Sequence, residues 1–143
     1  MTTAEIKSEL NKAREAARDY RLARDKANAY GQLLMGGKSV RYGSDGSTHE
    51  RDGNPVEKAY CTLSDYEAEA DRLLKEMNTA RQKAEEIISS VPNQSQREVL
   101  TRRYIIGQRW EDIAECMNYS RRRVTQLHGI ALKNISLNFP ISV

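Results

Sequence analysis

The residues with the clearest chemistry lie near the end of the chain, where Ser120 is followed by three consecutive arginines, Arg121, Arg122 and Arg123. Cations in the first turn of a helix oppose the helix dipole by roughly 0.3 to 1 kcal/mol each, and a phosphate partner removes this conflict. An arginine such as Arg122 suits guanine, and Thr125 one turn later suits a thymine methyl or a phosphate. The run therefore predicts a nucleic-acid contact, with a solvated basic turn as the alternative.

A helical wheel at about 100° per residue divides this predicted third C-terminal helix into two faces. The apolar face holds Val124, Leu127 and Ala131, with Leu132 and Ile135 near it. The opposite face holds Arg122, Thr125, Gln126 and Gly129, with Arg121 and Arg123 on its flanks. Major-groove docking requires this arrangement, because outer side chains reach base edges while flanking cations meet the phosphate walls. Gly129 lowers the helix propensity of this segment relative to alanine. It either permits close approach to DNA or is a weakness that the helix tolerates.

The segment before these arginines predicts two further short helices. Gln96 to Ile106 is stopped by Gly107, and Trp110 to Met117 begins with acidic residues that suit the helix dipole. Asn118 takes a turn position that needs a left-handed backbone, which asparagine tolerates. Ala114 is the small residue where two helices cross, and the expected apolar set around it is Ile113, Met117, Tyr119, Val124 and Leu127. Two helices joined by a tight turn give the layout of a helix-turn-helix.

The first 92 residues predict two long helices around a loop. A stripe of small and apolar residues runs from Thr3 to about Met35, and the stretch 36–54 holds five glycines. From Pro55, eleven positions alternate by three and four without a miss: Val56, Ala59, Leu63, Tyr66, Ala70, Leu73, Met77, Ala80, Ala84, Ile87 and Val91. Such helices should pair antiparallel and coiled-coil-like, within one chain or between two. Two interpretations of this loop are open. Its basic residues contact DNA or a partner, or the loop is only the tip of the hairpin.

The net charge differs between the first 92 residues and the rest of the chain. The chain carries 23 basic and 20 acidic side chains, a net charge of +3. Residues 1–92 carry −1 and residues 93–143 carry +4. An asymmetry of this kind favours a nucleic-acid partner for the second segment. We therefore predict an all-α fold with a helical hairpin in 1–92, including its glycine-rich loop 36–54, and a DNA-binding helix-turn-helix domain in 93–143.

Other classes of protein find little support in the sequence. No apolar stretch is long enough to cross a membrane and the N-terminus lacks a signal-peptide layout, so we expect a cytoplasmic protein with no membrane partner.

Cys61 and Cys116 are far apart and are expected to be unpaired. His49 and His128 are isolated, and no nucleophile elbow, phosphate loop or metal-ligand spacing is present. We expect no enzyme activity, no catalytic residues, no metal site and no cofactor.

The C-terminal motifs resemble region 4 of bacterial sigma-70 factors. The matching segments are Arg97–Tyr104, Trp110–Glu115, Ser120–Gln126 and Ala131–Leu132, and the similarity covers about 45 residues. A long helical segment before such a region also resembles the small phage transcriptional regulators of Gram-positive bacteria, the RinA-like and ArpU-like late-gene activators. The resemblance implies a helix-turn-helix that reads the upstream promoter hexamer through its third helix, and a polymerase contact.

Carried onto this chain, the family's DNA-reading positions are Arg121, Arg122, Thr125 and Gln126. Arg121 and Gln126 agree with the family, whereas Arg122 replaces a common acidic residue and Thr125 a common basic one. Arg109 stands where the family has a Thr or Ser cap, and it could reach a phosphate instead. No segment resembles sigma region 2, so we do not expect a complete sigma factor.

These patterns predict a sequence-specific transcriptional regulator of phage or prophage origin. Its expected partners are double-stranded DNA, RNA polymerase and a second copy bound through the N-terminal helices. A DNA-packaging oligomer resembling a terminase small subunit is the alternative, although such proteins usually place the DNA-binding part first. A module that holds RNA polymerase without reading DNA is the third reading.

Overall fold

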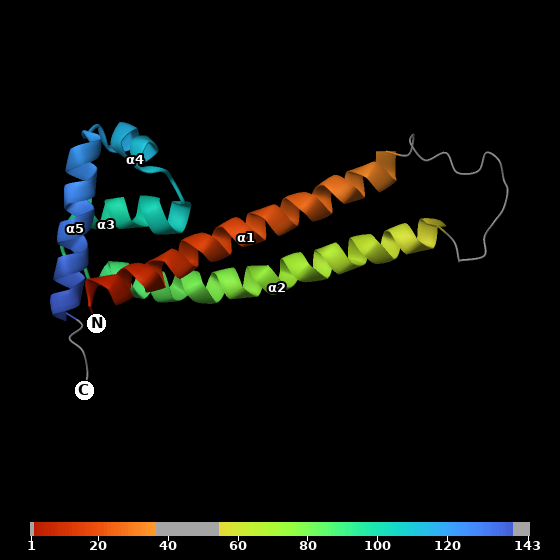
Figure 1. The fold of residues 1–143 in the computed structure, drawn as a ribbon, viewed down its shortest axis with the longest axis horizontal. Helices are drawn as coiled ribbons and strands as arrows, with labels where there is room; N and C mark the ends of the chain where they lie inside the picture. The colour runs from red at the N-terminus through yellow and green to blue at the C-terminus, as the bar shows by residue number, and fades with distance from the viewer. Residues whose placement is uncertain (1, 37–54, 139–143) are drawn as a thin grey trace. The chain divides into compact units, whose positions relative to one another are not determined.

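The computed structural model describes residues 2–36 and 55–138, and every secondary-structure element in these ranges is helical. In chain order the elements are α1 (Thr3–Gly36), α2 (Pro55–Ser89), α3 (Gln94–Leu100), the π-helix η1 (Thr101–Ile106), α4 (Trp110–Met117) and α5 (Arg121–Asn138) (Figure 1). The expected all-α class is confirmed for the described residues. The predicted loop 36–54 lies outside them except for Gly36, which is the last residue of α1.

Local sequence signals account for most helix ends. The Thr2 hydroxyl accepts a hydrogen bond from the Glu5 amide at 3.2 Å, and the Glu5 carboxylate accepts one from the Thr2 amide at 2.9 Å, which is a capping box. Pro55 is the first residue of α2, as predicted, because a first helical position needs no amide donor. Asn93 caps α3 by accepting a hydrogen bond from the Gln96 amide at 3.0 Å.

The stretch predicted as one helix from Gln96 to Ile106 contains a change of helix type. It begins as α3 and continues as the wider η1, which ends at Gly107 with a left-handed φ of 89°. The amides of Gly107 and Gln108 both donate to the Arg102 carbonyl, at 3.0 and 2.9 Å. The predicted stop at Gly107 is confirmed, whereas the π-helix was not predicted.

The chain forms two compact units. One comprises Met1–Arg18 and Lys75–Val143, and the other comprises Asp19–Leu74. The first unit takes residues from both sides of the boundary predicted between 92 and 93. The beginning of α1 and the end of α2 therefore pack with the C-terminal helices, while the boundary itself stays a prediction.

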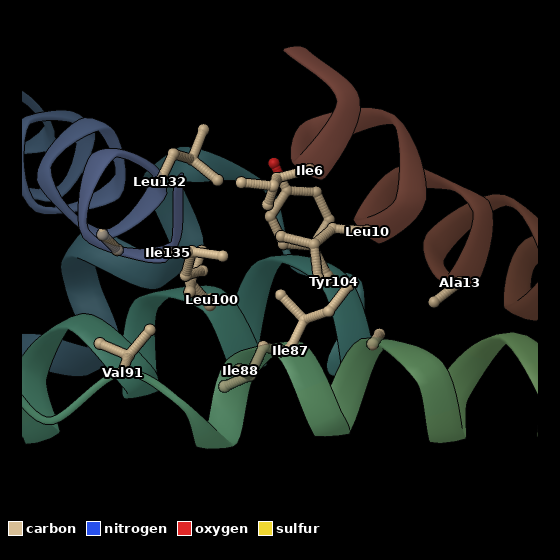
Figure 2. Packing of buried hydrophobic residues seen from close by; sticks show 12 residues of the cluster. Ile6, Leu10, Ala13, Ile87, Ile88, Val91, Leu100, Tyr104, Leu132 and Ile135 are labelled. Atoms are coloured by element: carbon tan, nitrogen blue, oxygen red, sulfur yellow. The ribbon is translucent and has the colours of Figure 1, made fainter. Parts of the chain in front are cut away.

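The larger core of the first unit is built by four segments of the chain (Figure 2). Its buried residues are Ile6, Leu10 and Ala13 of α1; Ala84, Ile87 and Ile88 of α2; Val91, Leu100 and Tyr104; and Ala131, Leu132 and Ile135 of α5. Tyr104 is 1% exposed and is the largest of the fully buried side chains. Figure 2 shows its ring close to Ile6 and Leu10. Burial of this apolar area at about 25 cal/mol per Å² is what holds the α1 end against the C-terminal helices.

A second core lies under α4 and the beginning of α5. Its buried residues are Val99, Ile113, Ala114, Val124 and Leu127, and Trp110 and Met117 pack against them. Tyr119, which we expected in this apolar set, is 39% exposed. That prediction was wrong because Tyr119 lies in the turn between α4 and α5, where helical spacing does not apply.

In the second unit, α1 and α2 pack through small residues and tyrosines. Tyr30 and Tyr66 meet edge to face with ring centroids 5.3 Å apart, and the Lys26 ammonium lies 4.3 Å from the Tyr66 ring centre. Among the eleven predicted seam positions of α2, only Val56, in the first turn, is exposed. The stripe is confirmed at the other ten positions, which are buried or partly buried.

A substitution in α1 tests whether that helix is part of the C-terminal core. Leu10→Ala removes a side chain that is 0% exposed, and we expect the free energy of unfolding to fall by about 2 to 5 kcal/mol. Leu22→Ala is the matched control, because Leu22 is 70% exposed on the same helix and its loss should cost less than about 0.5 kcal/mol. Denaturant unfolding followed by fluorescence of Trp110, the single tryptophan, measures both. An unchanged Trp110 midpoint in Leu10→Ala would contradict a shared core.

Candidate nucleic-acid interface

The turn between α4 and α5 adopts the backbone that its residues predict. Asn118 has φ 61° and ψ 37°, in the left-handed region, as expected for an asparagine in place of glycine. The Tyr119 amide donates to the Ala114 carbonyl at 3.0 Å, which satisfies an orphan carbonyl at the end of α4. Ser120 then accepts a hydrogen bond from the Arg123 amide at 3.0 Å and so caps the beginning of α5.

The predicted faces of α5 are confirmed by burial. Val124, Leu127, Ala131, Leu132 and Ile135 are buried, and they join the two cores. The predicted contact residues of this helix, together with Gly129, are all exposed: Arg121, Arg122, Arg123, Thr125 and Gln126. Helix α5 is therefore anchored by one side and exposes these polar residues on the other, with the apolar Ile130, 44% exposed, after them. That the exposed residues bind nucleic acid stays a prediction.

Arg109 is placed on a different element from the other predicted contacts. It is the N-cap residue of α4, and its side chain makes no capping hydrogen bond. Its Nε instead lies 3.4 Å from Asp112 Oδ2, and its side chain is 75% exposed. Helices α4 and α5 pack against each other, so Arg109 belongs to the same unit as the arginines of α5. Arg109 is therefore exposed but held near Asp112, and its contact with a phosphate stays a prediction.

The three consecutive arginines differ in whether they form an ion pair. Arg121 Nη1 lies 3.7 Å from Glu111 Oε2, which links the beginning of α5 to the first turn of α4. Arg122 and Arg123 form no ion pair with any carboxylate of the described residues. A solvent-exposed ion pair contributes less than about 1 kcal/mol to the free energy of unfolding. The pair with Glu111 therefore orients the Arg121 side chain and adds little to the stability of the fold. The two unpaired arginines leave uncompensated positive charge on α5.

His128, which the sequence suggested to be isolated, is a buried residue of α5. Its Nε2 is hydrogen-bonded to the Tyr104 hydroxyl at 2.7 Å, and the Trp110 ring meets it edge to face at 4.9 Å. The signal was present in the sequence, because position 128 lies four residues after Val124 and three before Ala131 on the buried face. A single histidine on an otherwise apolar face does not by itself identify its hydrogen-bond partner.

Burial determines the ionisation of this pair. It lowers the pKa of His128 to about 4, and the positive charges of Lys7 and Arg103 act in the same direction. Burial also raises the pKa of Tyr104 to about 12. Both groups are therefore neutral at pH 7, and their hydrogen bond is one between uncharged partners.

Other kinds of site are not evident in the part of the chain that the structure describes. No group of three or more potential ligands could hold a metal ion among residues 2–36 and 55–138. No helix in these ranges is long and apolar enough to cross a membrane. Cys61 and Cys116 are both free and exposed, as expected.

No family model, no curated protein and no solved structure matches this chain.

The buried histidine predicts a specific pH dependence of stability. Its pKa is about 6.5 in the unfolded chain and about 4 in the folded protein, so the unfolded chain binds more protons between these values. The free energy of unfolding should therefore fall as the pH drops from about 6.5 to 4, by as much as about 3 kcal/mol from this group. His128→Gln keeps a hydrogen-bonding side chain that does not titrate, and the carboxylates common to both proteins cancel in the comparison. Equal pH slopes for the two proteins in urea unfolding would contradict the assignment.

Proposed function

We propose that this protein is a sequence-specific regulator of transcription that binds double-stranded DNA through a helix-turn-helix made of α4 and α5. The observation that carries the proposal is the two-sided character of α5, which begins three residues after the left-handed Asn118 and is anchored by Val124 and Leu127. Its other side is exposed and holds the basic and polar residues from Arg121 to Gln126. A helix held in this way can enter the major groove with its outer side chains against base edges.

The packing between the two helices supports this motif. Ala114 is 9% exposed and lies with Ile113 in the core that also holds Val124 and Leu127. A small residue at this place lets the helices approach closely where they cross. The exposed first turn of α5 is then carried on a rigid support, which base readout requires.

Electrostatics supports a DNA partner over a solvated basic turn. Arg122 and Arg123 lie in the first turn of α5, where they oppose the helix dipole, and neither is paired with a carboxylate among the described residues. Phosphate groups relieve this repulsion and release counterions when they bind. Arg122, Thr125 and Gln126 are the proposed base-reading residues, and Arg121, Arg123 and Arg109 are the proposed phosphate contacts.

The long helices are proposed to form an antiparallel hairpin that sets the oligomeric state. In the first unit Glu9 lies 3.9 Å from Lys83, and in the second unit Tyr30 meets Tyr66. An early residue of α1 thus contacts a late residue of α2, and a late residue of α1 contacts an earlier residue of α2. This is the contact pattern of an antiparallel pair. A homodimer through these helices would place two copies of α5 on a two-fold symmetric site. RNA polymerase is the proposed second partner, by resemblance to sigma region 4. A phage or prophage origin is proposed from the separate resemblance to the small RinA-like and ArpU-like regulators.

Variants of α5 test the base-reading face. Arg122→Ala and Gln126→Ala should change which DNA sequences are selected from a random pool, because these side chains are proposed to contact base edges. Arg123→Ala should weaken binding on all sequences alike and reduce the salt slope by about one, because it is proposed to contact a phosphate. An equal loss on every sequence for all three variants would rule out base reading by this face.

The packaging alternative predicts a different assembly. A monomer or dimer in solution is expected for a regulator, whereas a ring of eight or more subunits would favour a terminase-like packaging role. Light scattering of the intact protein distinguishes them. If the intact protein has no affinity for DNA even at low salt, the third reading, a module that holds RNA polymerase without reading DNA, would replace both.

A further inference from the structure

An open groove lies along the exposed side of α5 and extends beyond the residues proposed to read DNA. Its volume is about 620 Å³, roughly twenty times the share of one water molecule in liquid water, so it has room for part of a ligand. Thr3, the first residue of α1, lines it from the other side. Helix α5 contributes Thr125, Gln126, Gly129, Ile130 and Lys133 to its lining. Two proposed DNA contacts therefore share this groove with three exposed residues that have no assigned role.

Gly129 is not required by the packing of the protein. A Cβ atom built at this position would meet no atom within 4 Å apart from its chain neighbours and the backbone of its own helix. Alanine is a better helix former than glycine at such a position. The glycine instead leaves open space on the outer side of α5, where a ligand can approach the helix backbone closely.

Ile130 contributes an exposed apolar side chain to the same groove. It is 44% exposed, although the two residues after it are buried in the larger core. It lies one helical turn after Gln126, about 6 Å along the helix axis, and consecutive base pairs of DNA are about 3.4 Å apart. If Gln126 reads a base, Ile130 is placed about two base pairs away from it. The apolar group that the major groove displays is the C5-methyl group of thymine.

The charge of α5 favours a polyanion as the occupant of the groove. The helix contains no Asp or Glu. Lys133 is exposed and forms no ion pair with a carboxylate of the described residues. It follows Gly129 by one turn, so it is placed to meet a phosphate of a DNA strand that passes over the glycine. A second copy of this chain would bring the same basic helix against the groove and be repelled.

We propose that this groove receives the C5-methyl group of a thymine, with Ile130 as its apolar contact, Gly129 leaving room for the base and Lys133 contacting the adjacent phosphate backbone. The inference rests on the proposed function, because it requires α5 to dock in the major groove. It adds to that function a thymine about two base pairs from the base that Gln126 reads. Burial of one methyl group corresponds to about a fourfold change in affinity.

The test removes the methyl group from the DNA and the apolar side chain from the protein. A binding site is selected from a random pool with the intact protein, and each thymine in it is then replaced in turn by deoxyuridine, which lacks the methyl group. Replacement at one position should weaken binding by about fourfold. Ile130→Ala should weaken binding to the unmodified site by a similar or larger factor, and it should not respond to deoxyuridine at that position.

Leu137→Ala is the matched control for this variant. Leu137 is 77% exposed on the same helix and does not line the groove. We expect Leu137→Ala to bind the selected site as the unmodified protein does and to respond to deoxyuridine in the same way.

A variant at Gly129 provides a second measurement. Gly129→Ala should not lower the unfolding temperature, because the added methyl group meets no neighbouring atom within 4 Å outside its own helix backbone and chain neighbours. It should nevertheless weaken binding to the selected site, because the methyl group fills the space left for the base. Undiminished binding by Gly129→Ala would contradict close approach at this position.

The outcomes separate this inference from the proposed function. A selected site in which no deoxyuridine weakens binding, or equal responses of Ile130→Ala and the unmodified protein, would overturn the thymine contact and leave the proposed function standing. A change from dimer to monomer in Ile130→Ala, measured by light scattering, would also overturn it, because the groove would then be an interface between copies. Failure of the unmodified protein to bind any DNA would overturn both.

Discussion

The hydroxyl of Tyr104 is buried in a core from which water is excluded, and a buried hydroxyl needs a hydrogen-bond partner. His128 supplies that partner at 2.7 Å. Tyr104 belongs to the larger core, while His128 contacts Trp110, which packs on the second core. This one bond therefore connects the two cores of the first unit. It also fixes the rotation of α5, because turning the helix by one residue would carry His128 away from Tyr104.

The same tyrosine explains why α1 belongs with the C-terminal helices. Ile6 and Leu10 are both 0% exposed and lie in the core around the Tyr104 ring. Without them, one side of that ring and the apolar side of Leu132 would face water. The C-terminal helices are thus completed by a helix that precedes them, and the orientation of α5 depends on residues more than a hundred positions earlier in the chain.

Sequence predicted the parts of this arrangement that depend on local chemistry. The left-handed turn at Asn118 and the stop at Gly107 each follow from the dihedral preferences of one residue. The two faces of α5 followed from helical spacing alone. Fold class and helix positions were therefore accessible without coordinates.

The remaining features depend on contacts between distant residues. The contact of α1 with η1 joins residues about ninety positions apart. The spacing of apolar residues identifies the apolar face of each helix but not the helix against which that face packs. His128 was assigned no role because its partner Tyr104 is 24 residues away. The wider turn of η1 has no simple residue signature. Tyr119 was expected among the apolar contacts of the turn, but a residue in a turn is buried only when another element covers it, and Tyr119 is 39% exposed.

Pairing, more than the count of charges, determines where the protein can attract an anion. Among the described residues after 92, three of the four acids lie near an arginine: Glu98 near Arg102, Glu111 near Arg121 and Asp112 near Arg109. Subtracting these pairs leaves five basic residues without an ion pair, and two of them, Arg122 and Arg123, are neighbours at the exposed beginning of α5; the five are Arg97, Arg103, Arg122, Arg123 and Lys133. A net charge of +3 spread evenly over the chain would attract polyanions weakly. Concentrated in unpaired guanidinium groups at the exposed beginning of α5, the same small excess of charge produces a local positive potential.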